Sequence, residues 1–167
     1  VVMIMIMVMT PVHMQHVDVS LQLIGLVISV HVLGMFALSP IVGWGVDRFG
    51  REPVILAGAA VLLGSALISG LAPADSVVAL SVGLFLLGLG WSCTLIAGST
   101  LLTDDVDPAD RPAIQGLADL VMNVAGAAGG VIAGVVVIAS SYTVLCFAAA
   151  LPVLALLLMV GFVRRAG

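Results

Sequence analysis

The 167-residue sequence contains no lysine, and only 8% of its residues are charged. Soluble globular domains usually carry about 25% charged residues, so this composition excludes an ordinary soluble domain. The basic residues are five arginines, spread along the chain rather than gathered in one block. The clustered positive charge of a nucleic-acid-binding surface is therefore absent.

Cysteine is almost as scarce, with two residues, Cys93 and Cys146, both inside apolar stretches. Their number and placement exclude a disulfide framework and a cysteine metal site. The sequence also lacks a Gly-x-Ser-x-Gly nucleophile elbow, a His-Glu-x-x-His zinc helix and a phosphate-binding Gly-x-x-x-x-Gly-Lys loop. We therefore expect no enzymatic activity, no cofactor and no energy supply from nucleotide hydrolysis.

What the sequence does contain is hydrophobic residues, which make up 62% of the chain and give a mean hydropathy of +1.34. Five apolar runs reach the roughly 20 residues that a membrane-spanning helix needs, whereas the first run is a truncated helix of about half that length. Lipid cannot satisfy free backbone groups, so runs of this length must be helices. The sequence predicts an all-α integral membrane protein, a multi-pass helical bundle forming a single domain over 1–167. The expected segments are 1–12 (truncated), 20–43, 53–72, 76–102, 113–138 and 142–163.

The arginines indicate the orientation of these segments. Arg48 and Arg51 fall in the predicted loop 44–52, Arg111 falls in the predicted loop 103–112, and Arg164 with Arg165 follows the last segment. The intervening loops carry no basic residue. The positive-inside rule places the arginine-bearing loops and the carboxyl terminus in the cytoplasm of a cell, plasma or inner, membrane.

The turn between the second and third segments has the pattern Gly-x-Gly-x-Asp-Arg-x-Gly-Arg. In sequence and in position it resembles the signature loop of the major facilitator superfamily, a family of secondary transporters. Gly45 and Glu52 depart from the family pattern. The matching residues are Gly43, Asp47, Arg48, Gly50 and Arg51. The resemblance implies that they form a conformational latch between two six-helix halves of a twelve-helix fold. The alternative is a basic turn that only sets topology.

The resemblance also indicates which half is present. Amino-terminal halves of the family commonly carry an arginine early in the fourth helix, and the corresponding run 76–102 has none. The chain also ends shortly after Arg165 without a long central loop. We therefore expect a carboxyl-terminal six-helix half, whose partners are the lipid bilayer and a missing amino-terminal half.

Ionisable residues inside a bilayer are costly, so Asp119 and His31 are the first candidates for a functional site. Asp119 lies seven residues after Pro112, roughly 10 Å along a helix, and so near the inner interface. We expect it to pair with an arginine; the alternative is ion coupling or substrate contact. His31, in mid-span, either faces a cavity or bonds a neighbouring helix. Further polar candidates, which either line a cavity or bridge helices, are Trp91, Ser92, Thr94, Gln115 and Asn123.

Two more patterns have mainly structural interpretations. Gly126, Gly130 and Gly134 repeat every four residues and predict a helix-packing surface. His13, His16 and Asp18 have ligand-type side chains at helical spacing, but they lack a fourth ligand, and an outer loop without metal is the preferred interpretation.

Together these features predict a secondary active transporter that moves a small solute by alternating access, with proton-coupled efflux as the preferred direction. The alternative is a non-transporting scaffold or subunit, or a degraded half-transporter. In the transporter interpretation, the acidic loop is expected to meet Arg48 and Arg51. Its acidic residues are Asp104, Asp105, Asp107 and Asp110.

Overall fold

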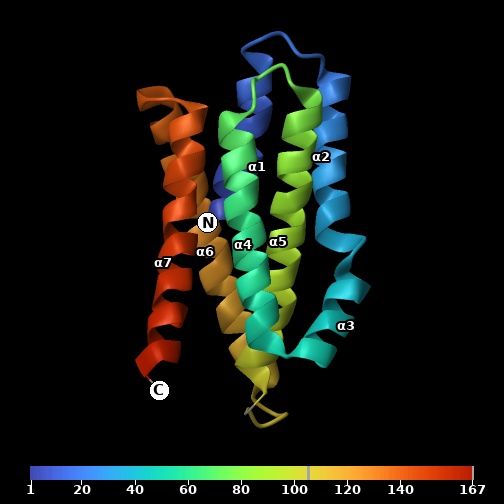
Figure 1. Cartoon of the computed structure of the whole chain (residues 1–167), viewed down its shortest axis with the longest axis vertical. Coiled ribbons are helices and arrows are strands. Elements are labelled where there is room, and N and C mark those ends of the chain that lie inside the picture. The colour runs from blue at the N-terminus through green and yellow to red at the C-terminus, as the bar shows by residue number, and fades with distance from the viewer. Residues whose placement is uncertain (105, 167) are drawn as a thin grey trace.

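The computed structural model describes residues 1–104 and 106–166, with side chains described as far as residue 158. Within these residues the chain is helical and has no strand, so the all-α prediction is confirmed. Figure 1 shows long helices running up and down through a single bundle. The helices are α1 (Val2–Gln15), α2 (Leu21–Phe36), α3 (Ser39–Phe49), α4 (Arg51–Leu71), α5 (Val77–Thr103), α6 (Arg111–Ala139) and α7 (Tyr142–Ala166).

Four helical stretches of the described chain are long and apolar enough to cross a membrane. They are Leu21–Phe49, Arg51–Leu71, Val77–Thr103 and Arg111–Ala139. Two shorter apolar helices, Val2–Gln15 and Tyr142–Leu158, flank them in sequence. The first of these covers the segment expected over 1–12 and continues through Pro11 to Gln15.

The second segment differs from the prediction of a span over 20–43 followed by a loop over 44–52. The helix stops after Phe36, and a new helix, α3, begins at Ser39 with Pro40 in its first turn. Proline favours a first-turn position because it has no N–H to donate and its φ is already helical. Nothing between Pro40 and Phe49 interrupts α3, so the only residue between α3 and α4 is Gly50. Gly50 has a φ of 90°, a value that glycine adopts far more easily than other residues.

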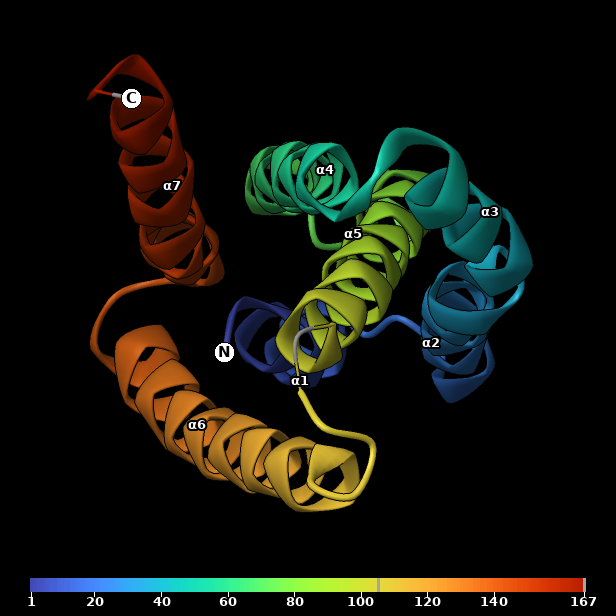
Figure 2. The ribbon, with the colours of Figure 1, turned by 90° about the horizontal axis from the view of Figure 1, so that it is seen from below.

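Helix α5 forms the centre of the bundle, with α2 and α4 on either side of it (Figure 2). Glycines let these helices approach closely. A Cβ added to Gly58 of α4 would lie 2.7 Å from the Cβ of Cys93 in α5. A Cβ added to Gly88 of α5 would lie 2.8 Å from the backbone nitrogen of Met35 in α2. Neither joint has room for a larger side chain.

The carboxyl-terminal part of α1 contacts the start of α7. The hydroxyl of Thr10 donates its one proton to the carbonyl of Ile6, at 2.7 Å, so the Tyr142 hydroxyl must be the donor in its own 2.7 Å bond to Thr10 Oγ1. The ring of His13 stacks on Tyr142 with the ring centres 4.2 Å apart. Both Thr10 and Tyr142 are buried.

The turns of the bundle alternate between its two ends. The α3–α4 turn with Arg48 and Arg51, the α5–α6 loop before Arg111 and the end of α7 all lie at one end (Figure 1). The α1–α2, α4–α5 and α6–α7 connections lie at the other. This alternation is the one that the arginine pattern predicts.

Candidate functional site

A hollow lies between α1, α5 and α6, and it has two adjoining parts. The larger part has a volume of about 440 Å³ and the smaller about 300 Å³. Val1, Trp91 and Met122 line both parts. The larger part is otherwise lined by Met3, Ile4, Asn123, Gly126, Ala127 and Gly130. The smaller part is otherwise lined by Thr94, Leu95, Gly98, Ser99, Leu102, Gln115, Ala118 and Asp119.

Most of the candidate cavity residues come together around this hollow. Trp91 and Thr94 reach it from α5, and Gln115, Asp119 and Asn123 reach it from α6. The three polar residues of α6 are spaced four apart, which places them on one face of that helix. Side chains from two separate helices therefore face a common space.

His31 and Ser92 are not among the residues that line the hollow. His31 is fully buried on α2, and its Nδ1 donates to the carbonyl of Leu84 in α5 at 2.8 Å. It therefore bonds a neighbouring helix. Ser92 is 2% exposed within α5.

Asp119 has an amide partner in place of the expected arginine. Gln115 Nε2 donates to Asp119 Oδ1 at 3.3 Å, and the Asn123 amide donates to the backbone carbonyl of Asp119 at 2.8 Å. Among the residues with described side chains, Arg51 pairs with Asp104, and Asp119 has no arginine partner. The expectation that Asp119 pairs with an arginine is corrected, because its nearest polar neighbours lie on its own helix face.

The glycine stripe of α6 serves two surfaces. A Cβ added to Gly126 would lie 3.4 Å from Cγ1 of Ile4, and one on Gly130 would lie 3.8 Å from Cγ2 of the same residue. Both glycines also line the larger part of the hollow. An added Cβ on Gly134 would meet nothing within 4 Å. The stripe brings α6 beside α1 at Gly126 and Gly130 and keeps the hollow open there.

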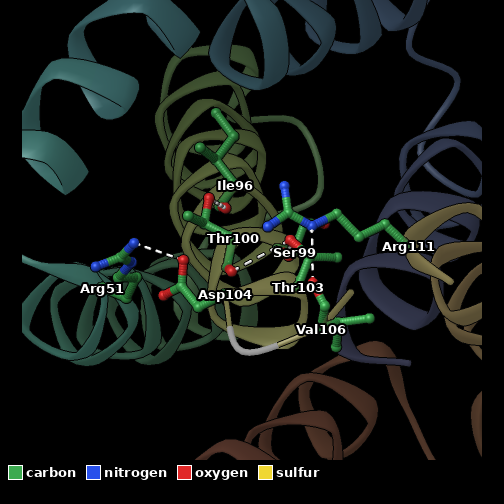
Figure 3. Close-up of polar contacts among 8 residues, drawn as sticks. All are labelled: Arg51, Ile96, Ser99, Thr100, Thr103, Asp104, Val106 and Arg111. Carbon is green, nitrogen blue, oxygen red and sulfur yellow. Dashed lines mark hydrogen bonds and ion pairs between the residues drawn. The ribbon is translucent and has the colours of Figure 1, made fainter. Parts of the chain in front are cut away.

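At the charged end of the bundle Arg51 forms an ion pair with Asp104, which Figure 3 shows. Arg51 Nη2 lies 2.6 Å from Asp104 Oδ1, with side chains 42% and 31% exposed, and so joins the start of α4 to the end of α5. The Arg111 Nε donates to the carbonyl of Val106 at 3.2 Å. The predicted meeting of the acidic loop with Arg51 is present, whereas Arg48 has no ion pair within the described chain. Asp105 lies outside the described residues.

Sequence reasoning missed several lining residues, among them Leu95, Gly98 and Ser99. They lie four, seven and eight residues after Trp91, which is the spacing of one helix face. That spacing could have found them once Trp91 was chosen.

At the carboxyl-terminal end of α1, the His16 ring Nδ1 donates to the carbonyl of Val12 at 2.7 Å. Among the residues described, no three His, Cys, Asp or Glu side chains are grouped so that they could hold a metal ion.

Comparison with known proteins places this architecture in context. The family model described as Major Facilitator Superfamily matches residues 1–166. The chain is 45% identical over 154 residues to the uncharacterized MFS-type transporter YddS of Bacillus subtilis, which covers 92% of this chain and 35% of that protein. It is 42% identical over 145 residues to YdeG of the same organism, another uncharacterized MFS-type transporter, covering 87% of this chain and 34% of YdeG.

A more distant relative has a more specific name. The multidrug resistance protein MdtL of Escherichia coli is 33% identical over 89 residues, covering 53% of this chain and 22% of MdtL. No solved structure matches the chain significantly. The chain spans about a third of the length of YddS and YdeG.

Proposed function

Because the chain belongs to the major facilitator superfamily, we propose that it is part of a secondary transporter that moves a small solute across a membrane by alternating access. The observation that carries this proposal is the family match over residues 1–166. In addition, a carboxylate, two amides and an indole from α5 and α6 line one hollow of an otherwise apolar bundle. No chemical step on the solute is proposed.

The chain would supply the carboxyl-terminal six helices of the transporter. Two features support this assignment: the fourth segment, α5, has no arginine, and the six segments follow one another with short turns. The end of the bundle that carries Arg48, Arg51 and Arg111 would face the cytoplasm, in keeping with the positive-inside rule. The solute path would then lie between this half and an amino-terminal half with the same number of helices.

The motif turn would act as a latch in this cycle. Arg51 joins α4 to α5 through Asp104, which fixes the turn to its own half. Asp47 and Arg48 make no ion pair within the described chain, so both are available to charged groups of the other half. The latch would hold the two halves together on the cytoplasmic side when the transporter is open to the outside.

Efflux by proton antiport is the direction that we propose. The relationship to a protein named for multidrug resistance supports efflux. A carboxylate in the hollow supports proton coupling, because Asp119 could exchange a proton as the solute binds and leaves.

Flux through the full-length protein in proteoliposomes tests the proposal. A pH gradient is imposed, and the uptake of one cationic, one anionic and one neutral solute is followed: tetraphenylphosphonium, fluorescein and glucose. Gradient-driven accumulation of any of them, above that of protein-free vesicles, supports a transporter. If correctly inserted, full-length protein moves none of them under either gradient direction, the result favours a non-transporting scaffold.

A further inference from the structure

The carboxyl-terminal end of α1 carries two histidines within one helical turn. His13 and His16 are three residues apart, which makes them neighbours on the surface of the helix. His13 is partly buried, and its ring stacks on Tyr142 of α7 with the ring centres 4.2 Å apart and the planes 14° from parallel. His16 is exposed. Histidine is the side chain whose charge ordinarily changes between pH 8 and pH 5.

The tyrosine of this stack also bonds α1 to α7. The Tyr142 hydroxyl donates to Thr10 at 2.7 Å, and the Thr10 hydroxyl donates to the carbonyl of Ile6 at 2.7 Å. Thr10 is fully buried and Tyr142 is 3% exposed. His13 follows Thr10 by three residues, so one tyrosine contacts two successive positions on one face of α1. The imidazole is therefore the water-facing part of a link whose inner part is a buried pair of hydroxyls.

A proton on His13 is unfavourable in the stacked position. The face of Tyr142 attracts an imidazolium, but burial removes part of its water and a charged His16 repels it. Burial and His16 together hold the pKa of His13 below its usual range. A histidine whose pKa is lower in the folded protein than in water stabilises the fold above its ordinary pKa, and this contribution is lost as the pH falls. Acid therefore weakens the stack.

The other elements that pack against α1 bring few further charges to this end of the bundle. α6 ends at the uncharged turn 140–141, α4 and α5 are joined by a turn that contains Asp75, and α2 begins shortly after Asp18. Both carboxylates are exposed. Tyr142 of α7 is a phenol, which stays uncharged over this pH range. The two histidines are thus the groups of this end whose charge responds to a change from pH 8 to pH 5.

We propose that His13 and Tyr142 form a proton-sensitive clasp between α1 and α7. The clasp is closed while both histidines are neutral, and it opens when protons from the surrounding water bind to the two imidazoles. This inference goes beyond the proposed transport function and does not depend on it. If the arginine turns face the cytoplasm, as proposed above, the clasp lies on the outer side of the membrane. Acid outside the cell would then free this end of α1 from α7.

Hydrogen exchange of the full-length protein in detergent tests the clasp. Exchange is followed by mass spectrometry at pH 8 and pH 5 and corrected for the intrinsic rate at each pH. The expected result is exchange about two- to tenfold faster at pH 5 in the peptide over residues 10–18, which is the equilibrium effect of losing one aromatic pair. Equal corrected exchange of this peptide at the two pH values overturns the proposal.

Variants assign the response to the stack. His13→Phe keeps an aromatic ring on Tyr142 but takes up no proton, so its corrected exchange should be slow at both pH values. His16→Gln should keep a smaller pH response, because only the repulsion is removed. The matched control is Asp75→Asn, which changes another exposed residue at the same end and should keep the full response. If His13→Phe also keeps the full response, the proton acts elsewhere and the proposal is wrong.

A second peptide separates opening of the clasp from a general loss of stability in acid. Residues 54–64 of α4 lie toward the arginine end of the bundle, away from the clasp. Their corrected exchange should be the same at pH 8 and pH 5, because the clasp opens locally. Equal acceleration of both peptides at pH 5 would show unfolding of the whole bundle and would contradict a local clasp.

Discussion

Replacing Gly34 with alanine is expected to push α2 away from α5. A Cβ at this position would lie 3.1 Å from the carbonyl carbon and 3.2 Å from the Cα of Phe85, and closer still to the Phe85 carbonyl oxygen. All three atoms belong to the backbone of α5, so no side-chain rotation can make room. Since non-bonded carbon atoms normally stand about 3.5–4.0 Å apart, the two helices must separate locally by about 0.5–1 Å.

The cost follows from what this joint contains. Val27, Leu84 and Leu87 are at most 1% exposed around it, and a gap of this size forfeits about a quarter to a half of each contact energy. The 2.8 Å bond from His31 to Leu84 would also stretch, and such a bond contributes about 0.5–1.5 kcal/mol. Overfilling a well-packed site typically costs about 1–3 kcal/mol, and we expect Gly34→Ala to fall in that range.

Gly25→Ala is the matched control, because Gly25 lies on the same helix and an added Cβ there meets nothing within 4 Å. Both variants gain up to about 1 kcal/mol of helix propensity, so the difference between them isolates the steric cost. The measurement is reversible unfolding of the full-length protein in mixed micelles of a mild detergent and dodecyl sulfate. Equal unfolding free energies for the two variants would refute the reasoning about the α2–α5 joint.

Three further predictions concern other side chains of the bundle. Tyr142→Phe should lower the unfolding free energy by about 0.5–1.5 kcal/mol, and the same change in a Thr10→Val background should cost nothing more; equal costs in both backgrounds would contradict the bond between them. A double-mutant cycle on Arg51 and Asp104 should give a coupling of about 1 kcal/mol or less, decreasing with added salt, because the pair is partly exposed; a salt-independent coupling of several kcal/mol would contradict a surface pair. Asp47→Arg should abolish solute flux while membrane insertion, measured by extraction resistance, stays intact; equal loss of both would reject the latch.

Six helical segments and the end at which each turn lies could be predicted from the sequence, although one of the six is divided into α2 and α3. Segment length sets the first, because the bilayer demands about 20 apolar residues per crossing. The positions of Arg48, Arg51 and Arg111 set the second. Gln115, Asp119 and Asn123 could also be placed on one helix face, since polar residues four apart in an apolar helix have only one arrangement.

For the more uniformly apolar helices, the side that faces each neighbouring helix could not be predicted. Helix α2 is hydrophobic on all sides, so nothing in its pattern shows that His31 turns toward α5 rather than toward the hollow. The position of Ser92 inside α5 had the same difficulty. The break after Phe36 was missed for a related reason: hydrophobicity is continuous there, and Pro40 is the only local sign that a new helix begins.

The break between α2 and α3 has a consequence for how the protein fits its bilayer. Sixteen residues of α2 extend about 24 Å, which is shorter than the roughly 30 Å hydrocarbon layer, whereas a straight helix over the 29 residues from Leu21 to Phe49 would be about 43 Å long. Figure 1 shows α3 inclined to α2. The depth that the two helices reach together therefore lies between these two lengths. A small swing of α3 about Ala37 and Leu38 would change the depth of the arginine turn without disturbing the contact of α2 with α5. The segment could thereby match membranes of different thickness by hydrophobic adjustment at one hinge.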